Sequence, residues 1–267
     1  MASTELLVCE LGALDYRSAL RLQERLREAR ALERAPDTLL LLEHSPAVYT
    51  RGRRSTPGEL SMGEEWYAQR GIEIIDTNRG GKVTYHGPGQ LVGYPIVQVQ
   101  DVVAYVRLLE QSLVDALAEV GLGARARPQD GPAYTGVWVD TRKIASIGVH
   151  VSHGVTTHGF AINVQERALP PFGWVVACGL PDVEMTSIET ERRRARGSAE
   201  HHTGTAPRNE ELESHNTPAG EGPVPPQVEL VAFGRLAAAA LARRLGHQLR
   251  QITRDELESL TSPAAAE

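Results

Sequence analysis

Apolar residues recur at helical spacing in three segments of the chain. In residues 14–33 they lie three or four positions apart between charged residues, and this pattern predicts a surface helix. Residues 102–120 carry a longer apolar stripe, and Gly121 is well placed to end that helix. Residues 228–245, rich in Ala, Leu and Arg, predict a third helix.

Short apolar runs bounded by turn-forming residues predict β-strands. The run TLLLLE at residues 38–43 is typical of a buried strand, whereas residues 45–61, with several Pro, Gly and Arg, predict a loop. Further strands are predicted at residues 72–75, 93–99, 136–140, 143–151 and 155–164, with Asp140 to Arg142 joining two of them in a hairpin. Strands mixed with a few helices predict an α/β, α+β-like fold with a mixed sheet and flanking helices.

The polarity of the chain changes at about residue 191. Residues 191–227 hold almost no large apolar side chain and many Pro, Gly, Ser and Glu, so they predict a flexible, low-complexity insertion. The rest of the 267 residues suffices for one sizeable core. We therefore expect one domain from residues 1–190 plus 228–250, and a C-terminal tail at 251–267.

Charge and cysteine content exclude several classes of protein. The net charge of −6 gives no global basic field for nucleic acid or anionic lipid, although Arg51, Arg53 and Arg54 could form a local basic patch. Two cysteines, Cys9 and Cys178, make no disulfide framework and no structural zinc site by themselves. No secretory signal and no membrane-spanning run is apparent, so we expect a cytoplasmic protein.

The stretch RGGKVTYHGPGQ at residues 79–90 is the densest candidate for a binding site. Its glycines let the backbone approach a ligand and expose N–H groups, and its side chains include several hydrogen-bond donors. It is not a phosphate-binding Walker loop, whose spacing differs. A turn-rich connector between strands is an equally good interpretation from composition alone.

Cys178 and Lys143 are the two candidates for catalytic chemistry. Cys178 precedes Gly179 and Pro181, in a turn where a thiol can face a cleft, but a lone cysteine is more often a buried apolar side chain. Lys143 is one of only two lysines in a chain that otherwise uses arginine, which indicates that a primary amine is needed at this position. As a cation it would favour a thiolate, and unlike arginine it can also lose its proton. A lysine pointing into water from a hairpin is the alternative.

The histidines do not predict a metal site. His150 and His153 fall on opposite faces of a strand, and no cysteine or paired carboxylate completes a ligand set. A Cys–His pair that uses His86 or His158 is a lesser variant of the nucleophile hypothesis.

Taken together, four segments resemble the motifs of the octanoyltransferases, the lipoate–protein ligase B family. They are Arg79 to Gln90, then Lys143 to Gly148 preceded by Gly136-Val137-Trp138, then Thr157 to Asn163, and Cys178-Gly179-Leu180. Glu43-His44-Ser45-Pro46 also resembles a family motif, with serine in place of one proline. The resemblance covers about residues 5–190, and Cys9 matches no motif.

The resemblance implies a biotin–lipoate ligase-like fold and an acyltransferase activity. Such an enzyme takes octanoyl from octanoyl-acyl carrier protein and attaches it to a specific lysine of lipoyl domains, in 2-oxoacid dehydrogenase complexes and in the glycine cleavage H protein. It implies Cys178 as the nucleophile that carries a thioester and Lys143 as its partner. Neither ATP nor a metal is implied as a cofactor. The positions that match the acyl site are Arg79, Gly80, Gly81, Lys82, Val83, Thr84, Tyr85, His86, Ser146, Ile147, Gly148, Gly159, Phe160 and Ala161.

Two other classes of function compete with this prediction. An ATP-dependent lipoate or biotin protein ligase would share the fold but form an acyl-adenylate and need no thiol. A non-catalytic module that docks lipoyl domains would need no chemistry at all. Omission of ATP separates the first from a transferase, and loss of Cys178 without effect on function would identify the second.

Overall fold

The structure is a computed structural model that describes residues 4–56, 58–176, 183–202 and 230–261 of the chain. Its main element is a mixed eight-stranded sheet in the order β11-β1-β2-β6-β10-β9-β8-β7. The first three strands are parallel and the others pair antiparallel. The strands are β1 (Glu5–Leu14), β2 (Asp37–His44), β6 (Gln90–Ile96), β7 (Arg125–Ala126), β8 (Gly136–Val139), β9 (Arg142–Ser152), β10 (Val155–Asn163) and β11 (Gln248–Gln251).

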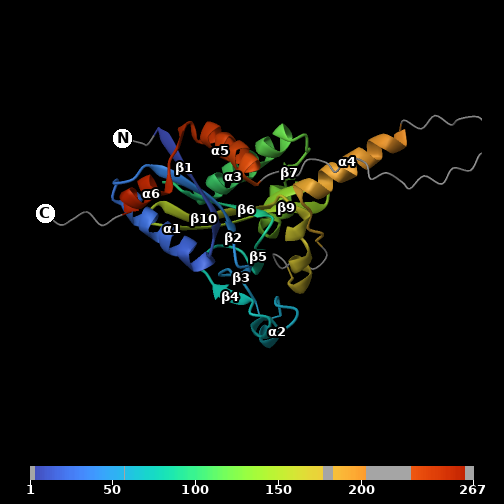
Figure 1. Ribbon diagram of the computed structural model, residues 1–267. Coiled ribbons are helices and arrows are strands. Elements are labelled where there is room, and N and C mark those ends of the chain that lie inside the picture. The colour runs from blue at the N-terminus through green and yellow to red at the C-terminus, as the bar shows by residue number, and fades with distance from the viewer. Residues whose placement is uncertain (1–3, 57, 177–182, 203–229, 262–267) are drawn as a thin grey trace, which may run out of the picture.

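A second sheet of three short strands lies beside the first (Figure 1). In it β3 (Val48–Arg51) is central, parallel to β4 (Glu73–Asp76) and antiparallel to β5 (Thr84–His86). The short helix α2 (Glu64–Gln69) precedes β4. The glycine-rich segment that leads into β5 is joined directly to the large sheet, because the Gly80 N–H donates to the carbonyl of Val149 on β9 over 2.9 Å.

Helices cover both faces of the large sheet (Figure 1). The helices α3 (Val102–Glu119) and α5 (Leu230–Leu245) pack on one face, and α1 (Tyr16–Ala31) and α6 (Arg254–Thr261) on the other. The side chain of Asp15 caps α1, and that of Asp101 caps α3. The remaining ordered turns are the 3₁₀ segments η1 (Pro128–Asp130), η2 (Pro132–Tyr134), η3 (Glu166–Ala168) and η4 (Pro170–Trp174).

The apolar run of β2 serves both layers. Leu39 and Leu41 belong to the core under α3 and α5, whereas Leu40 and Leu42 belong to the core under α1. Strand alternation sends successive side chains to opposite faces, so a continuous apolar run fits a strand that is covered on both sides. The prediction of a buried strand here is confirmed, and so is the mixed-sheet α/β fold class.

Three segments differ from the sequence-based expectation. The predicted loop 45–61 contains β3, whose residues Val48, Tyr49 and Thr50 are buried between two strands that are remote in sequence. The predicted tail after residue 250 contains α6, because Leu257 is fully buried against the α1 side of the sheet. β3 is only four residues long and lies among Pro, Gly and Arg residues, and α6 has few apolar residues. The sequence pattern therefore indicated neither element.

The third difference is the helix α4 (Ile188–His202), which enters the segment expected to be flexible from residue 191. It extends away from the body of the fold (Figure 1). The Ser187 hydroxyl accepts from the Thr190 N–H at its start, and Arg142 of β9 donates to both carboxylate oxygens of Glu191. A cap and a buried ion pair thus order this helix without a long apolar stripe. Residues 203–227 of the expected insertion lie outside the described segments, and the division into domains stays a prediction.

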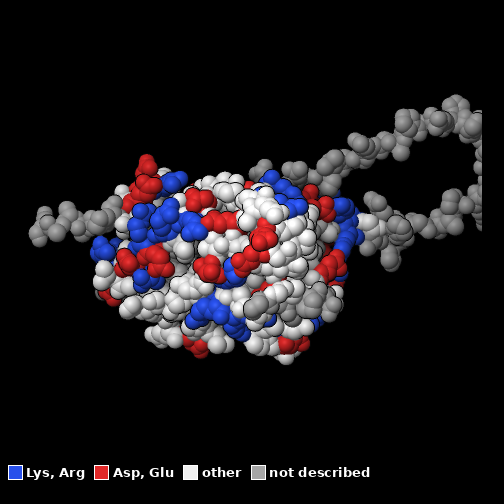
Figure 2. Space-filling model, turned by 90° about the horizontal axis from the view of Figure 1, so that it is seen from below, with Lys and Arg blue, Asp and Glu red and all other residues white. Residues whose placement is uncertain are grey.

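The surface carries charges of both signs, intermixed with uncharged areas, on the face seen in Figure 2. None of the helices in the described segments has the length and apolar character that crossing a bilayer would require.

Candidate active site

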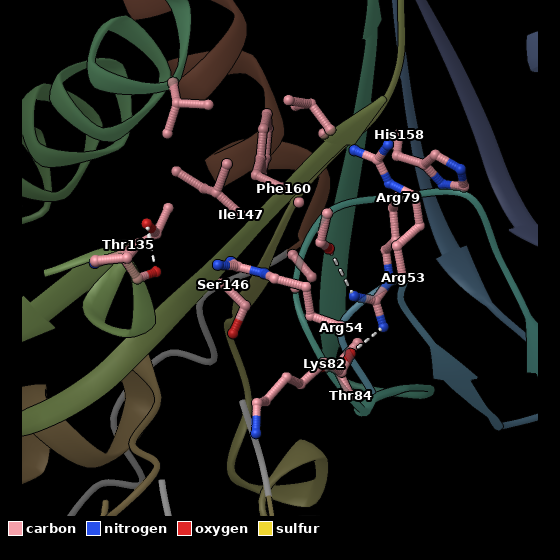
Figure 3. Close-up of a pocket in the computed structure, with 18 of the residues that line it drawn as sticks. Arg53, Arg54, Arg79, Lys82, Thr84, Thr135, Ser146, Ile147, His158 and Phe160 are labelled. Carbon is pink, nitrogen blue, oxygen red and sulfur yellow. Dashed lines mark hydrogen bonds between the residues drawn. The ribbon is translucent and has the colours of Figure 1, made fainter. Parts of the chain in front are cut away.

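A cavity of about 880 Å³ lies where the glycine-rich segment meets the large sheet. Its walls come from β5, from the middle of β9 and β10, from the first turns of α3 and from the turns η1 and η2. In Figure 3 the apolar side chains Ile147 and Phe160 lie toward one end and Lys82 toward the other. The cavity therefore has an apolar part and a polar, basic part.

The structure brings nearly all of the predicted site residues to this cavity. Three stretches that are far apart in sequence converge there, at residues 79–86, 143–148 and 159–161. The lining members are Arg79, Gly80, Gly81, Lys82, Thr84, His86, Lys143, Ser146, Ile147, Gly148, Gly159, Phe160 and Ala161.

Val83 and Tyr85 are the described exceptions. Both are buried in an aromatic cluster with Tyr49 and Tyr67, outside the cavity. Alternation along β5 explains the division, because Thr84 and His86 face the cavity and Tyr85 must then face away. The predicted direct contact of Val83 and Tyr85 with a substrate finds no support in their position.

Arg79 is a buried cation held by the backbone around it. Its guanidinium donates to the hydroxyl and the carbonyl oxygen of Thr50, and to the carbonyl oxygens of Gly80 and Lys82, over 2.8–3.2 Å. Two of these bonds are drawn in Figure 3. Bonds to charged donors are among the strong ones, so Arg79 fixes the shape of the loop as well as placing a positive charge at the cavity.

Close backbone approach explains three glycines of the site. A Cβ on Gly148 would lie 2.8 Å from the carbonyl oxygen of Gly80, and one on Gly159 would lie 2.3 Å from that of Gly93. A Cβ on Gly136 would lie 2.8 Å from Cε of Lys143, and its φ of +133° also disfavours a side chain. These positions let strands and loop meet without displacing the cavity wall.

Lys143 is almost fully buried, at 1% exposure, and so it does not point into water as the alternative interpretation held. Its side chain passes beside Gly136, and its ammonium nitrogen lies 5.4 Å from the centre of the Trp138 ring. Its backbone N–H donates to the Glu184 carbonyl, and its carbonyl oxygen accepts from the Thr186 N–H, both over 2.9 Å. Lys143 is thus fixed both by the hairpin and by the segment after residue 182.

Cys178 lies outside the described residues. The described residues that flank it in sequence are hydrogen-bonded to Lys143, which lines this cavity, and to Glu59, which pairs with the lining residue Lys82. The Val176 N–H donates to the carbonyl of Glu59, whose carboxylate pairs with Lys82 over 2.8 Å, and Glu184 accepts from Lys143. Cys9, by contrast, is fully buried in the core under α1.

Three buried histidines lie at or next to the cavity: His86 and His158 line it, and the His44 ring lies 5.6 Å from that of His86. Desolvation lowers the pKa of His44 to about 4 and that of His158 to about 3, the positive charge of Arg79 adding to the latter. Burial, then His44 and Arg79, hold the pKa of His86 well below its ordinary value. All three are therefore neutral at physiological pH, which disfavours them as the cationic partner of a thiolate.

Two tyrosines complete this cluster. Tyr16 stacks on His86 with ring centroids 5.9 Å apart, and burial raises the pKa of Tyr16 to about 12. The Tyr94 hydroxyl lies 2.7 Å from Nε2 of His44, whose Nδ1 donates to the Leu14 carbonyl. Within the described residues, no group of three or more His, Cys, Asp and Glu is placed to hold a metal ion.

Several lining residues were not predicted for the site. Arg53 and Arg54 are exposed at the cavity, and their N–H groups donate to the carbonyls of Arg79 and Gly81. Val102, Val103 and Val106 of α3 extend the apolar wall. The arginine pair stood out as a possible basic patch, whereas the three valines appeared only as part of a helix, since no local pattern tells which surface of a helix lines a cavity.

Solved structures with a similar backbone are lipoate ligases. The crystal structure of lipoate–protein ligase A bound with ATP superimposes with a TM-score of 0.64 at 15% identity, covering 98% of this chain and 93% of that chain. A putative lipoate protein ligase from T. acidophilum with bound lipoic acid gives a TM-score of 0.63 at 15% identity, with the same coverage. At this identity the similarity shows the fold, and it confirms the lipoate ligase type of architecture.

Similarity in sequence is closer. The family model described as the lipoyl protein ligase A/B catalytic domain matches residues 15–200. The octanoyltransferase of Solibacter usitatus is 51% identical over 175 residues, which cover 64% of this chain and 77% of that protein. The octanoyltransferase of Mycolicibacterium paratuberculosis is 46% identical over 196 residues, or 70% of this chain and 78% of that protein. The chain therefore belongs to the lipoyl protein ligase A/B catalytic domain family and, within it, to the octanoyltransferases, which are acyltransferases.

Proposed function

We propose that the chain transfers an octanoyl group from octanoyl-acyl carrier protein to a lysine of lipoyl domains, through a thioester on Cys178. The observation that carries the proposal is the position of Lys143. Its amine is buried in the wall of a cavity that also has an apolar side. Of the described residues that flank Cys178, Glu184 is hydrogen-bonded to Lys143, and Val176 is hydrogen-bonded to Glu59, which pairs with Lys82 of the cavity wall. A thiol, an ammonium and room for an alkyl chain are what this transfer needs.

The first step is attack of the Cys178 thiolate on the carbonyl carbon of the donor thioester. A new C–S bond forms, the carrier's C–S bond breaks, and the carrier leaves as a thiolate that takes up the proton of the Lys143 ammonium, which leaves Lys143 as a neutral amine. An ammonium at Lys143 favours the thiolate form of a nearby cysteine. Exchange of one thioester for another is nearly balanced in energy, so this step needs no ATP, and we propose that no metal takes part.

In the second step the amine of the acceptor lysine attacks the thioester carbonyl. The C–N bond forms and the C–S bond to Cys178 breaks. The proton lost by the amine passes to the departing sulfur, with neutral Lys143 as its carrier. The amide is more stable than the thioester, so this step is downhill. Lipoyl domains of 2-oxoacid dehydrogenase complexes and the glycine cleavage H protein are the proposed acceptors.

The cavity wall supports the proposed binding roles. Ile147, Phe160 and Ala161, together with the valines at the start of α3, would contact the alkyl chain, since burial of each methylene contributes about 0.8 kcal/mol. Arg79, Gly80, Gly81, Lys82 and the 146–148 segment would surround the polar end of the substrate. Arg53 and Arg54 at the cavity would attract an acidic carrier protein.

Intact-mass spectrometry after incubation with octanoyl-acyl carrier protein tests the proposal. The wild type is expected to gain one octanoyl group in the absence of ATP and Mg²⁺, and to lose it when a lipoyl domain is added. Cys178→Ser should gain none, whereas Cys9→Ser, the matched control in the buried core, should gain the group as the wild type does. Acylation that requires ATP would instead identify a ligase, and acylation of Cys178→Ser would overturn the proposed nucleophile.

A further inference from the structure

Four buried hydrogen bonds join His86 to Lys143, and both residues line the cavity. His86 Nδ1 lies 2.8 Å from Oε1 of Gln90, and Nε2 of Gln90 donates to Oδ1 of Asn163 over 3.0 Å. Nδ2 of Asn163 donates to the Thr186 carbonyl over 3.0 Å, and the Thr186 N–H donates to the Lys143 carbonyl over 2.9 Å. His86, Gln90, Asn163, Thr186 and Lys143 are all buried.

The direction of every bond in this chain is set at one end. A backbone carbonyl can only accept, so Asn163 must turn its NH₂ group toward Thr186 and its oxygen toward Gln90. Gln90 must then donate through its own NH₂ group and present its oxygen to His86. The only arrangement left is for His86 to donate from Nδ1. Because burial keeps the ring neutral, its other nitrogen, Nε2, carries no proton.

The second ring nitrogen is available to a ligand. His86 lines the cavity, and its Nε2 makes no hydrogen bond to any residue within the described segments. A neutral imidazole in this tautomer is a hydrogen-bond acceptor for an N–H or O–H group. It is a poor base, because its pKa is held well below the ordinary value.

Asn163 is the branch point of this series of hydrogen bonds. One end of its amide sets the tautomer of His86 through Gln90, and the other end holds the segment that pairs with the backbone of Lys143 on both of its sides. Thr186 is also held by its hydroxyl, which donates to Glu191 over 2.6 Å. The amide of Asn163 therefore couples the orientation of a cavity acceptor to the position of the proposed catalytic amine.

We infer that Asn163 is a positioning residue of the active site, which fixes His86 as the neutral Nδ1–H tautomer and Lys143 in its place. This inference rests on the proposed function for the role of Lys143. The assignment of the His86 tautomer stands on the hydrogen bonds alone.

The tautomer is tested by ¹H–¹⁵N correlation through the ring couplings of ¹⁵N-histidine-labelled protein, with His86→Gln used to assign the signal. The wild type is expected to show a protonated Nδ1 and an unprotonated Nε2 for His86 from pH 6 to 8. A protonated Nε2, or a ring that titrates near 6.5, would overturn the assignment.

Two substitutions separate the two ends of Asn163. In Asn163→Asp the carboxylate still accepts from Gln90 but cannot donate to Thr186, so His86 should keep its tautomer while octanoyl transfer falls by about 100-fold through kcat. In Gln90→Leu the Nδ1–H loses its acceptor while the Asn163–Thr186 bond remains. That variant should show a mixture of His86 tautomers and a smaller loss in kcat.

The controls keep the test decisive. Asn78 is the exposed partner of another cavity histidine, and its Oδ1 lies 2.7 Å from Nε2 of His158. Asn78→Asp makes the same chemical change as Asn163→Asp and should leave the His86 tautomer unchanged. An unchanged tautomer in Gln90→Leu, which stays informative if Asn163→Asp does not fold, would refute the inference, as would full transfer by a folded Asn163→Asp. A wild type with the assigned tautomer but no octanoyl transfer would instead refute the proposed function.

Discussion

Replacement of Gly136 by alanine is expected to destabilise the fold and to disturb Lys143 together. The added Cβ would lie 2.3 Å from the carbonyl oxygen of Ala145 and 2.8 Å from Cε of Lys143. Overpacking of this kind costs about 1–3 kcal/mol. The φ of +133° adds strain for any residue with a Cβ, about 1–2 kcal/mol. The free energy of unfolding should therefore fall by about 2–5 kcal/mol.

Two other glycines isolate the contributions. Gly121 has φ of +78° but nothing within 4 Å of a Cβ, so Gly121→Ala should cost only the backbone strain of about 1–2 kcal/mol. Gly123 has neither feature, so Gly123→Ala should be neutral or stabilise by up to about 1 kcal/mol through the unfolded state.

Urea unfolding followed by circular dichroism measures the series. With a slope of about 3 kcal/mol per molar urea, the midpoint of Gly136→Ala should lie about 1 M below that of the wild type. Its rate of octanoyl transfer, measured without urea at a temperature where the variant is folded, should fall because Lys143 is displaced. If Gly136→Ala unfolds at the same midpoint as Gly121→Ala and transfers octanoyl at the wild-type rate, the close approach of Gly136 to Lys143 is refuted.

The buried histidines predict a stability that falls as the pH drops from about 6.5 toward 4. In the unfolded chain these histidines take up a proton near pH 6.5, but the pKa of folded His44 is about 4 and that of folded His158 about 3. Unfolding therefore binds protons in this range, and the free energy of unfolding falls by about 1.4 kcal/mol per pH unit for each histidine. A melting temperature that is equal at pH 7 and pH 5 would contradict this. Lys143→Met should lower kcat for octanoyl transfer by about 100-fold or more, and Lys143→Arg with full activity would rule out a proton-accepting amine. Charge reversal of Arg53 and Arg54 should raise KM for octanoyl-acyl carrier protein but not for a small octanoyl thioester, and the difference should shrink at high salt; equal effects on both donors would refute a docking role.

The sequence predicts those elements whose own residues decide their structure. The helices α1 and α3 carry regular apolar stripes, and β2 carries a short continuous apolar run that is typical of a strand buried on both faces, so all three were correctly predicted. β3 and α6 depend on partners far along the chain. The buried environment of β3 is created by pairing with β4 and β5, and no local pattern around Thr50 indicates that Arg79 will donate to it.

The site followed the same division. The resemblance assigned residues 79–86, 143–148 and 159–161 to one site, and most of them line one cavity. It could not separate Tyr85 from its neighbours on β5, because the direction in which a side chain faces depends on which side of the strand the large sheet lies. The hydrogen bonds that join Gln90, Asn163 and Thr186 could not be predicted from the sequence either, since each links residues more than twenty positions apart.

The short strand β11 has a consequence for association between molecules. It pairs with β1 along Glu5 to Val8 at one margin of the large sheet, although all four of its own residues are exposed. Without it, the N–H and C=O groups of β1 on that side would be open to a strand of another molecule. A chain cut after Leu245 should therefore self-associate at concentrations where the intact chain does not, even though none of the described residues removed lines the cavity.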